Sequence, residues 1–158
     1  MTKTVSSRLL FIGTVPVPAS EDVVLTEQLL RERFNIHWIG LHVGSLFLGK
    51  TLKGAPARNL ALHQLMERST NQQIKDELGD EDISLLTYLL SLIEQQRNGE
   101  AGTLLTNEYA NLIIVKVNGS VWVVRADWDF DCDDWLLDAV PFELPHEWYT
   151  GLQVISCE

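Results

Sequence analysis

Residues 109–130 read YANLIIVKVNGSVWVVRADWDF, two β-rich runs joined by Asn118-Gly119. An Asn-Gly pair favours a type I′ turn, because both turn positions need positive φ, and this turn matches the twist of two antiparallel strands. The turn predicts these cross-strand pairs: Val117–Ser120, Val115–Trp122, Ile113–Val124 and Tyr109–Trp128 on one side, and Lys116–Val121, Ile114–Val123 and Leu112–Arg125 on the other. Apolar residues on both sides indicate central strands that are covered on two faces.

The rest of the chain predicts one α+β domain over residues 1–158. A length of 158 residues with 46% hydrophobic and 22% charged residues is typical of a single globular domain. Residues 83–97 are apolar nearly all round, which favours a buried helix, and the alternative is a helix exposed for a homodimer. We expect a mixed, mainly antiparallel sheet, with helices packed around a buried central helix at about 83–97.

Local patterns predict the other elements. A strand at 8–15 is followed by a helix at 21–34, with Ser20 as its N-cap. Strands at 35–43 and 46–52 flank Gly44-Ser45, which has the chemistry of a two-residue hairpin turn. Further predicted elements are listed here in chain order: a helix at 56–68 with Pro56 in its first turn, a short helix ending at Leu78 with Gly79 as its left-handed cap, a short helix at 133–140, and a strand at 152–156.

The charge of the chain is uneven. The net charge is −10, and residues 101–158 carry 2 basic against 10 acidic side chains, a balance of −8. Such a field repels phosphate backbones, so we expect no nucleic-acid partner and favour a basic protein surface. The longest apolar stretches fall far short of the ~20 residues that a bilayer requires, so we expect no membrane partner and a cytoplasmic location. With only Cys132 and Cys157, we expect thiols rather than a disulfide scaffold.

Residues 44–51 match the phosphate-loop pattern G-x-x-x-x-G-K-[ST], with Gly44, Gly49, Lys50 and Thr51 at its fixed positions. In such a loop, backbone amides surround the phosphates and the lysine reaches their outer oxygens. Two features argue against the match: Leu46, Phe47 and Leu48 fill its variable positions, and Lys53-Gly54-Ala55-Pro56 ends any following helix after about one turn. A nucleotide-binding function through these four residues is therefore an alternative rather than our first interpretation.

Residues 127–138 read DWDFDCDDWLLD and contain six of the chain's aspartates. Asp127, Asp129, Asp131 and Asp138 match positions 1, 3, 5 and 12 of a calcium-binding EF-hand loop. Cys132 stands where the loop needs glycine, and position 12 is not glutamate. A divalent-cation site at these four residues is our second alternative.

The same segment also has the composition of a protein interface, in which aromatic anchors are surrounded by charge. We predict that Asp127, Asp129, Asp131, Asp134, Trp135 and Trp148 contact the partner, because both tryptophans fall outside the inward register of the hairpin. The remaining interpretation is structural: the aspartates cap a short helix and the tryptophans fill the core. The interface and structural interpretations are compatible with each other.

The sequence lacks a G-x-S-x-G elbow, an H-E-x-x-H motif and a local cysteine-protease signature. We therefore expect a protein that is not an enzyme and needs no cofactor. The first functional hypothesis is a small acidic interaction module, of adaptor, inhibitor, immunity or chaperone type, that binds a basic partner through its Asp/Trp-rich C-terminal surface.

Overall fold

The computed structural model describes residues 7–79 and 85–158. Its helices are α1 (Glu27–Phe34), α2 (Leu41–Phe47), α3 (Asn71–Leu78) and α4 (Leu86–Gln95). Its strands are β1 (Leu9–Val17), β2 (Val23–Val24), β3 (Ile36–Ile39), β4 (Thr51–Leu52), β5 (Arg58–Leu65), β6 (Ser69–Thr70), β7 (Asn111–Val117), β8 (Ser120–Asp129), β9 (Asp134–Pro141), β10 (Glu147–Trp148) and β11 (Gln153–Cys157). No helix in these two ranges combines the length and the apolar character needed to cross a membrane.

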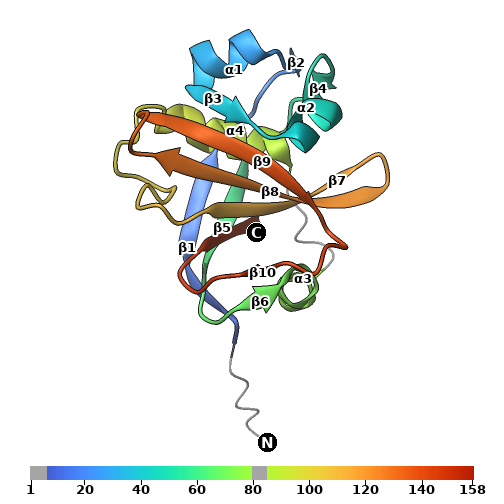
Figure 1. Ribbon diagram of the computed structural model, residues 1–158, viewed down its shortest axis with the longest axis vertical. Helices are drawn as coiled ribbons and strands as arrows, with labels where there is room; N and C mark the ends of the chain where they lie inside the picture. The colour runs from blue at the N-terminus through green and yellow to red at the C-terminus, as the bar shows by residue number, and fades with distance from the viewer. Residues whose placement is uncertain (1–6, 80–84) are drawn as a thin grey trace, which may run out of the picture.

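A seven-stranded sheet organises the chain, with strand order β1-β5-β11-β7-β8-β9-β3 (Figure 1). The β11–β7 and β3–β9 pairs are parallel and the other pairs are antiparallel. The predicted α+β class and mainly antiparallel sheet are therefore confirmed. Two small ladders, β10–β6 and β2–β4, lie outside the main sheet.

The β7–β8 hairpin has the register that the Asn-Gly turn predicts, from Val117–Ser120 to Leu112–Arg125. Asn118 and Gly119 adopt φ values of 50° and 82°, the positive pair that a type I′ turn requires. The predicted Tyr109–Trp128 pair is wrong, because β7 begins only at Asn111 and Trp128 pairs with Trp135 of β9.

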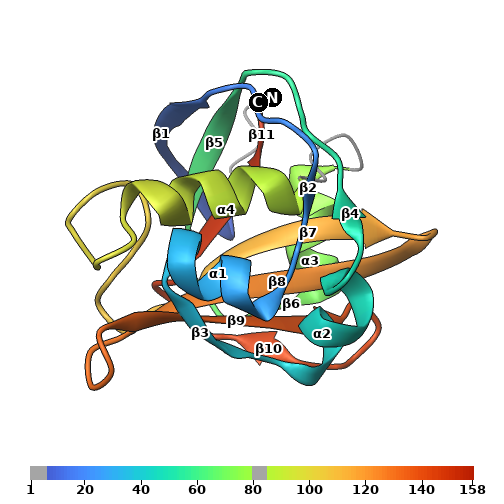
Figure 2. The ribbon, with the colours of Figure 1, turned by 90° about the horizontal axis from the view of Figure 1, so that it is seen from above.

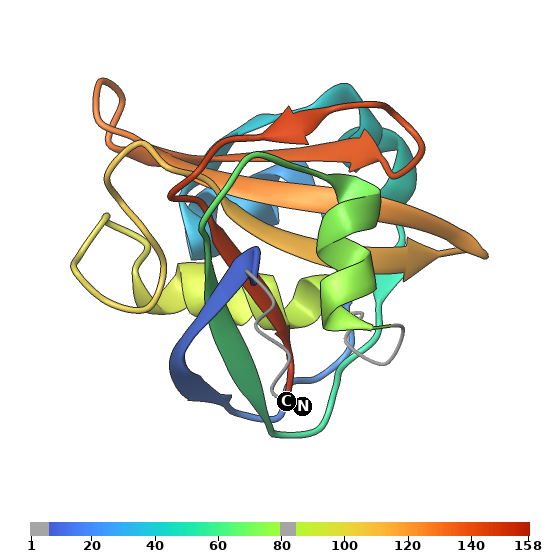
Figure 3. The ribbon, with the colours of Figure 1, turned by 90° about the horizontal axis from the view of Figure 1, so that it is seen from below.

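The two faces of the sheet carry separate apolar cores. On one face, α4 packs with Ile113 and Val124, and α1 contacts α4 (Figure 2). On the other face, α3 and β10 lie over the sheet (Figure 3). There Ile74 of α3 and Trp148 of β10 belong to the same apolar cluster as Ile114. Helix α4 buries seven of its ten residues, but the helices do not all gather around it, since α2 packs against β9 and α3 lies across the sheet. Residues 83 and 84, where we predicted this helix to begin, lie outside the described residues.

The helix predicted at 21–34 begins six residues later, at Glu27, and ends at Phe34 as expected. Its N-cap is Thr26, whose hydroxyl accepts a 3.0 Å hydrogen bond from the amide of Leu29. The predicted cap, Ser20, instead accepts from the amide of Ala55 at 3.1 Å. The early part of the predicted helix is extended because residues 23–24 pair with β4.

The helices predicted at 56–68 and 133–140 are wrong, because both segments are strands of the main sheet. Strand β5 lies between β1 and β11, so its backbone groups find partners on both sides. Strand β9 pairs with β8 from Pro141 to Asp134 and buries alternate residues, a period of two. In each case, neighbouring strands provide hydrogen-bond partners along the segment. This pairing outweighs the spacing of apolar residues, which by itself also fits a helix.

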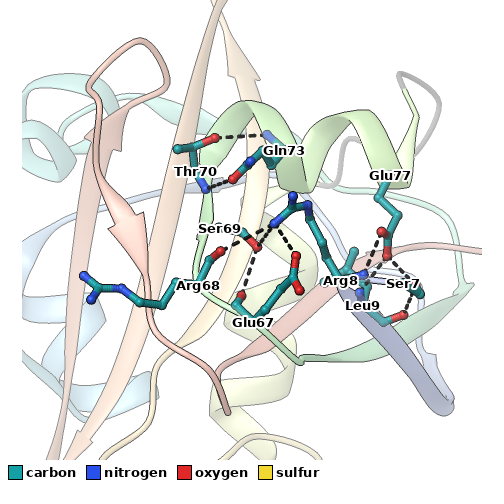
Figure 4. A network of polar contacts seen from close by, with 9 residues as sticks. All are labelled: Ser7, Arg8, Leu9, Glu67, Arg68, Ser69, Thr70, Gln73 and Glu77. Carbon is teal, nitrogen blue, oxygen red and sulfur yellow. Dashed lines mark hydrogen bonds and ion pairs between the residues drawn. The ribbon is translucent and has the colours of Figure 1, made fainter. Parts of the chain in front are cut away.

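The predicted helix end at Leu78 is confirmed, and Gly79 follows it with a φ of 87°. Its ψ of 166° lies outside the left-handed helical region, so the cap differs from the one predicted. At the other end of α3, Thr70 and Gln73 form a reciprocal capping box (Figure 4). The predicted strand at 152–156 is present as β11.

Helix α3 also fixes the start of β1. The carboxylate of Glu77 accepts hydrogen bonds from the Ser7 hydroxyl at 2.7 Å and from the amides of Arg8 and Leu9 at 2.9 and 2.6 Å (Figure 4). Arg8 is further paired with Glu67 at 2.6 Å. Burial raises the pKa of Glu77, but the three hydrogen bonds outweigh burial and lower the pKa. The ionised carboxylate is therefore the form that the fold prefers.

We expect Glu77→Gln to lower the free energy of unfolding by about 1 kcal/mol at neutral pH, because charge-assisted hydrogen bonds are lost at a solvent-exposed site. Because the pKa of Glu77 is lowered by folding, its ionised carboxylate stabilises the fold at any pH above the ordinary glutamate pKa of about 4.3. This stabilisation is lost as the pH falls through the pKa of the folded state. Urea denaturation as a function of pH should therefore show the two proteins converging in acid. Asp76→Asn on the same helix is the control. A difference that persists unchanged at acidic pH would contradict this assignment.

Candidate functional site: an acidic sheet face

Strands β8 and β9 place four aspartates on one face of the sheet. The cross-strand register sets Arg125 opposite Asp138, Asp127 opposite Leu136, and Asp129 opposite Asp134. Residues that pair directly lie on the same face, so these six side chains form one surface. We call Asp127, Asp129, Asp134 and Asp138 the acidic face.

The acidic face continues the sheet surface that α3 and β10 cover further along. Next to the Arg125–Asp138 pair comes the Val123–Val140 pair, which belongs to the apolar cluster around Ile74 and Trp148. The same face of the sheet is therefore divided into an apolar part, which α3 and β10 cover, and a charged part, whose four aspartates are half-buried.

Arg125 is the cation that the register places within the acidic face. Its guanidinium forms an ion pair with Asp127 and lies 5.5 Å from the ring centre of Trp148. The side chain of Asp129 accepts a 2.9 Å hydrogen bond from the amide of Asp131, and that of Asp138 accepts from the amide of Ala139 at 2.8 Å. Backbone amides neutralise no formal charge, so the surface keeps a strong negative balance.

A groove of about 230 Å³ lies on this surface, lined by Trp38, Arg125, Asp127, Leu136 and Asp138. Trp38 belongs to the edge strand β3, where it pairs in register with Leu136, and its side chain is 52% exposed. The groove therefore offers an indole and an aliphatic side chain between two carboxylates. This combination suits a ligand that is both cationic and partly apolar.

Gly40, directly after β3, brings the backbone close to Asp138. A Cβ atom at position 40 would lie 1.9 Å from Oδ1 of Asp138, so a larger residue there would displace the carboxylate. The amide of Gly40 donates to the carbonyl of Leu137 at 2.9 Å, which extends the β3–β9 pairing. The absence of a side chain at position 40 thus leaves room for the Asp138 carboxylate beside the groove.

Like charges meet at the far end of the acidic face. The pKa of Asp134 is raised, mainly because burial disfavours its ionised form and also because Asp129 and Asp133 lie nearby, while His37 acts in the opposite direction. The pKa of the Cys132 thiol is also raised, first by its hydrogen bond with Asp129 and then by the charge of that carboxylate. The ionised carboxylates around Asp134 and Cys132 therefore repel one another in the folded protein.

The structure moves both predicted contact tryptophans into the interior. Trp135 is fully buried, and its indole donates to the carbonyl of Gln96 at 3.0 Å. Trp148 is 2% exposed and donates to Oδ1 of Asn71 at 2.6 Å. The prediction that Trp135 is exposed rests on its position outside the 109–130 hairpin, but β9 adds a further strand in which Trp135 pairs with Trp128 and lies on the α4 side of the sheet.

The sequence interpretation missed Trp38, the exposed tryptophan of the groove. Its neighbours in β3 are His37 and Ile39, so no alternation of polar and apolar residues marks Trp38 as exposed. The sequence also gives no sign that β3 pairs with β9, 98 residues away. Of the predicted aspartates, Asp127, Asp129 and Asp134 lie on the acidic face. Asp131 lies beyond the end of β8, in the exposed turn.

The four carboxylates predicted to bind a divalent cation do not form an EF-hand loop. Residues 127–138 form a β-hairpin, and Asp138 lies four residues beyond Asp134 along β9, roughly 13 Å at the usual rise. The structure brings together a different group: ligand atoms of Asp129, Cys132 and Asp134 lie within 4.8 Å of one another. A thiolate with two carboxylates is a donor set that zinc accepts.

The phosphate-loop match also has a different structure. The hairpin predicted at Gly44-Ser45 is wrong, because both residues lie within α2, where Ser45 donates to the carbonyl of Leu41 at 3.0 Å. The amides at positions 44, 48, 49 and 50 donate to backbone carbonyls. A phosphate loop needs free amides followed by a helix, whereas here a helix comes first and a strand follows Gly49.

Comparison with known proteins identifies no family for this chain. No family model matches it, and neither a curated protein nor a solved structure matches it. The chemistry of the acidic face therefore has to be inferred from its own residues.

We expect Asp134→Asn to raise the free energy of unfolding at neutral pH by at most about 0.5 kcal/mol, because Asp134 is only half-buried and solvent screens its charge. Because the pKa of Asp134 is raised by folding, Asp134 is most favourable to the stability of the fold when the pH is below the ordinary aspartate pKa of about 3.9. This contribution to stability is lost as the pH rises through the pKa of the folded state. Thermal melts from pH 4 to pH 8 should therefore show a gain that grows with pH. Asp76→Asn, on α3, serves as the control. A loss of stability at neutral pH would show that the Asp134 carboxylate is structurally required.

Proposed function

We propose that this protein is a small binding module that holds a basic partner protein on the acidic face, with an arginine or lysine side chain of the partner in the groove beside Trp38. The observation that carries the proposal is the groove itself, where an exposed indole stands among carboxylates. In this interpretation the protein is an adaptor, inhibitor, immunity or chaperone-type protein, acts in the cytoplasm, and catalyses no reaction.

The shape of the groove supports a side chain that is apolar along its length and charged at its end. Leu136 and the indole of Trp38 offer apolar contact to a methylene chain, and Asp127 and Asp138 offer acceptors for a guanidinium or ammonium group. A cation over an indole gains about 0.5–1 kcal/mol at an exposed site, in addition to the charge pairs. Because Arg125 already pairs with Asp127, Asp138 is the acceptor that remains more available to a partner.

The repulsion at the end of the acidic face also supports a cationic partner. The pairing of Asp129 with Asp134 sets like charges directly opposite each other, which is unfavourable in an antiparallel ladder. A partner's basic group near this pair would lower the raised pKa of Asp134 and offset the repulsion between the two carboxylates. The interaction should accordingly weaken with increasing salt and with acidification.

A matched set of variants tests the acidic face. We expect the triple variant Asp129→Asn/Asp134→Asn/Asp138→Asn to bind an oligoarginine peptide at least about tenfold more weakly than the wild type at low salt. The control variant Glu27→Gln/Glu32→Gln/Asp76→Asn removes the same number of charges from α1 and α3. Fluorescence anisotropy of a labelled peptide measures both. Equal weakening in the two variants would mean that net charge alone attracts the peptide, and the proposal would fail.

Replacing Trp38 tests the groove separately from the charge. We expect Trp38→Ala to weaken peptide binding roughly three- to fivefold while changing the unfolding free energy by less than about 0.5 kcal/mol. Phe11→Ala removes an aromatic side chain of similar exposure, 57%, from the opposite edge of the sheet and should leave binding unchanged. Titration isotherms and urea melts of both variants provide the comparison. Unchanged affinity in Trp38→Ala would contradict the role of the groove.

A further inference from the structure

A second pocket, of about 370 Å³, lies at the other end of the hairpin strands from the acidic face. It is lined by residues from the end of α2, from β4 and the residues beside it, and from the tip of the β7–β8 hairpin: Leu46, Phe47, Lys50, Thr51, Leu52, Lys53, Lys116, Val117 and Asn118. Figure 2 shows α2 and β4 beside the far end of β7. The volume falls within the range of about 300–1,000 Å³ that is usual for small-molecule sites.

The pocket exists because the hairpin extends beyond its neighbour in the sheet. Within the described residues, β11 pairs with β7 only from Asn111 to Ile113. The rest of β7, up to Val117, continues past that ladder and forms one wall. The opposite wall is β4, which β2 holds through the Val24–Thr51 pair.

The charge of this pocket is opposite to that of the molecule. Lys50, Lys53 and Lys116, three of the five lysines in the chain, line it, and the lining contains no aspartate or glutamate. The ammonium group of Lys50 donates to the carbonyl of Ser45 at 3.0 Å, which positions it without neutralising it. Lys53 is paired with Asp22 at 3.3 Å, so its charge is partly compensated from outside the pocket.

We propose that this pocket binds a small phosphate ester, with the phosphate between Lys50 and Lys116 and the organic part against the apolar wall. Lysine ammonium groups are strong point-charge partners of phosphate, and the Thr51 hydroxyl and the Asn118 amide add donors. The apolar wall is the set of apolar lining residues, which come from both sides of the pocket: Leu46, Phe47, Leu52 and Val117. A long polyanion is disfavoured, because a chain with a net charge of −10 repels whatever extends beyond the pocket.

This mode of binding differs from that of a phosphate loop. The backbone amides at positions 48, 49 and 50 already donate to carbonyls, so lysine side chains supply the charge instead. The lining contains no carboxylate, the side chain that most often holds magnesium beside a bound phosphate. Binding should therefore need no magnesium and should weaken when magnesium neutralises part of the ligand's charge.

Isothermal titration of the full chain with AMP, ATP and pyrophosphate, each with and without magnesium, tests the proposal. We expect AMP and ATP to bind at low salt without magnesium, and pyrophosphate, which lacks an organic part, to bind more weakly. Lys50→Gln/Lys116→Gln should weaken AMP and ATP binding by at least about tenfold. The control Lys75→Gln/Arg58→Gln removes the same charge from α3 and β5 and should bind as the wild type does. Thermal melts of each variant check that it is folded.

Three results would overturn the inference. The first is the absence of binding by AMP and ATP up to millimolar concentrations at low salt. The second is equal weakening in the pocket variant and in the control variant, which would indicate attraction by net charge alone. The third is a strict requirement for magnesium that is lost in Thr51→Ala, which would indicate phosphate-loop binding instead. None of these results bears on the peptide binding proposed for the acidic face, so the two proposals fail separately.

Discussion

The pairing of β7 with β8 through the Asn118-Gly119 turn is the constraint on which the rest of the structure depends. Positive φ at both turn residues fixes the register, and a slip of one residue would exchange the two faces of β8. Because β8 also pairs with β9, the register decides that Val124 faces α4 and that Arg125 faces the opposite side. The turn therefore decides which side chains of β7 and β8 each core and the acidic face receive.

The sheet is covered unevenly, and this unevenness creates the candidate sites. Helix α4 packs on one face, whereas α3 and β10 cover only the part of the other face around Ile114 and Val123. Strand β8 is ten residues long, roughly 30 Å, and it separates a pocket with three lysines at the hairpin tip from aspartates at its far end. The two candidate sites therefore carry opposite charge at opposite ends of β8.

Local sequence patterns correctly predicted the elements whose hydrogen bonds join residues that are close together in the chain. The hairpin is one example, and the C-terminal ends of α1 and α3 are others, because turn and capping chemistry acts over a few residues. The patterns failed for β5 and β9, where apolar residues fit both a helix and a strand. The choice there depends on neighbours such as β1 and β11, which contact β5 from positions far away in the sequence.

By itself, the sequence determined the α+β class, the register of β7 with β8, and the concentration of acidic residues after position 100, since turn chemistry and composition are local properties. Only the tertiary structure decided which tryptophan is exposed, because burial depends on which elements pack against each face of the sheet. Trp135 is buried beneath α4, whereas Trp38 lies exposed on the edge strand β3. The tertiary structure also brought Lys50 and Lys116 to one pocket. Residues 66 positions apart meet only when strands from different parts of the chain pack together.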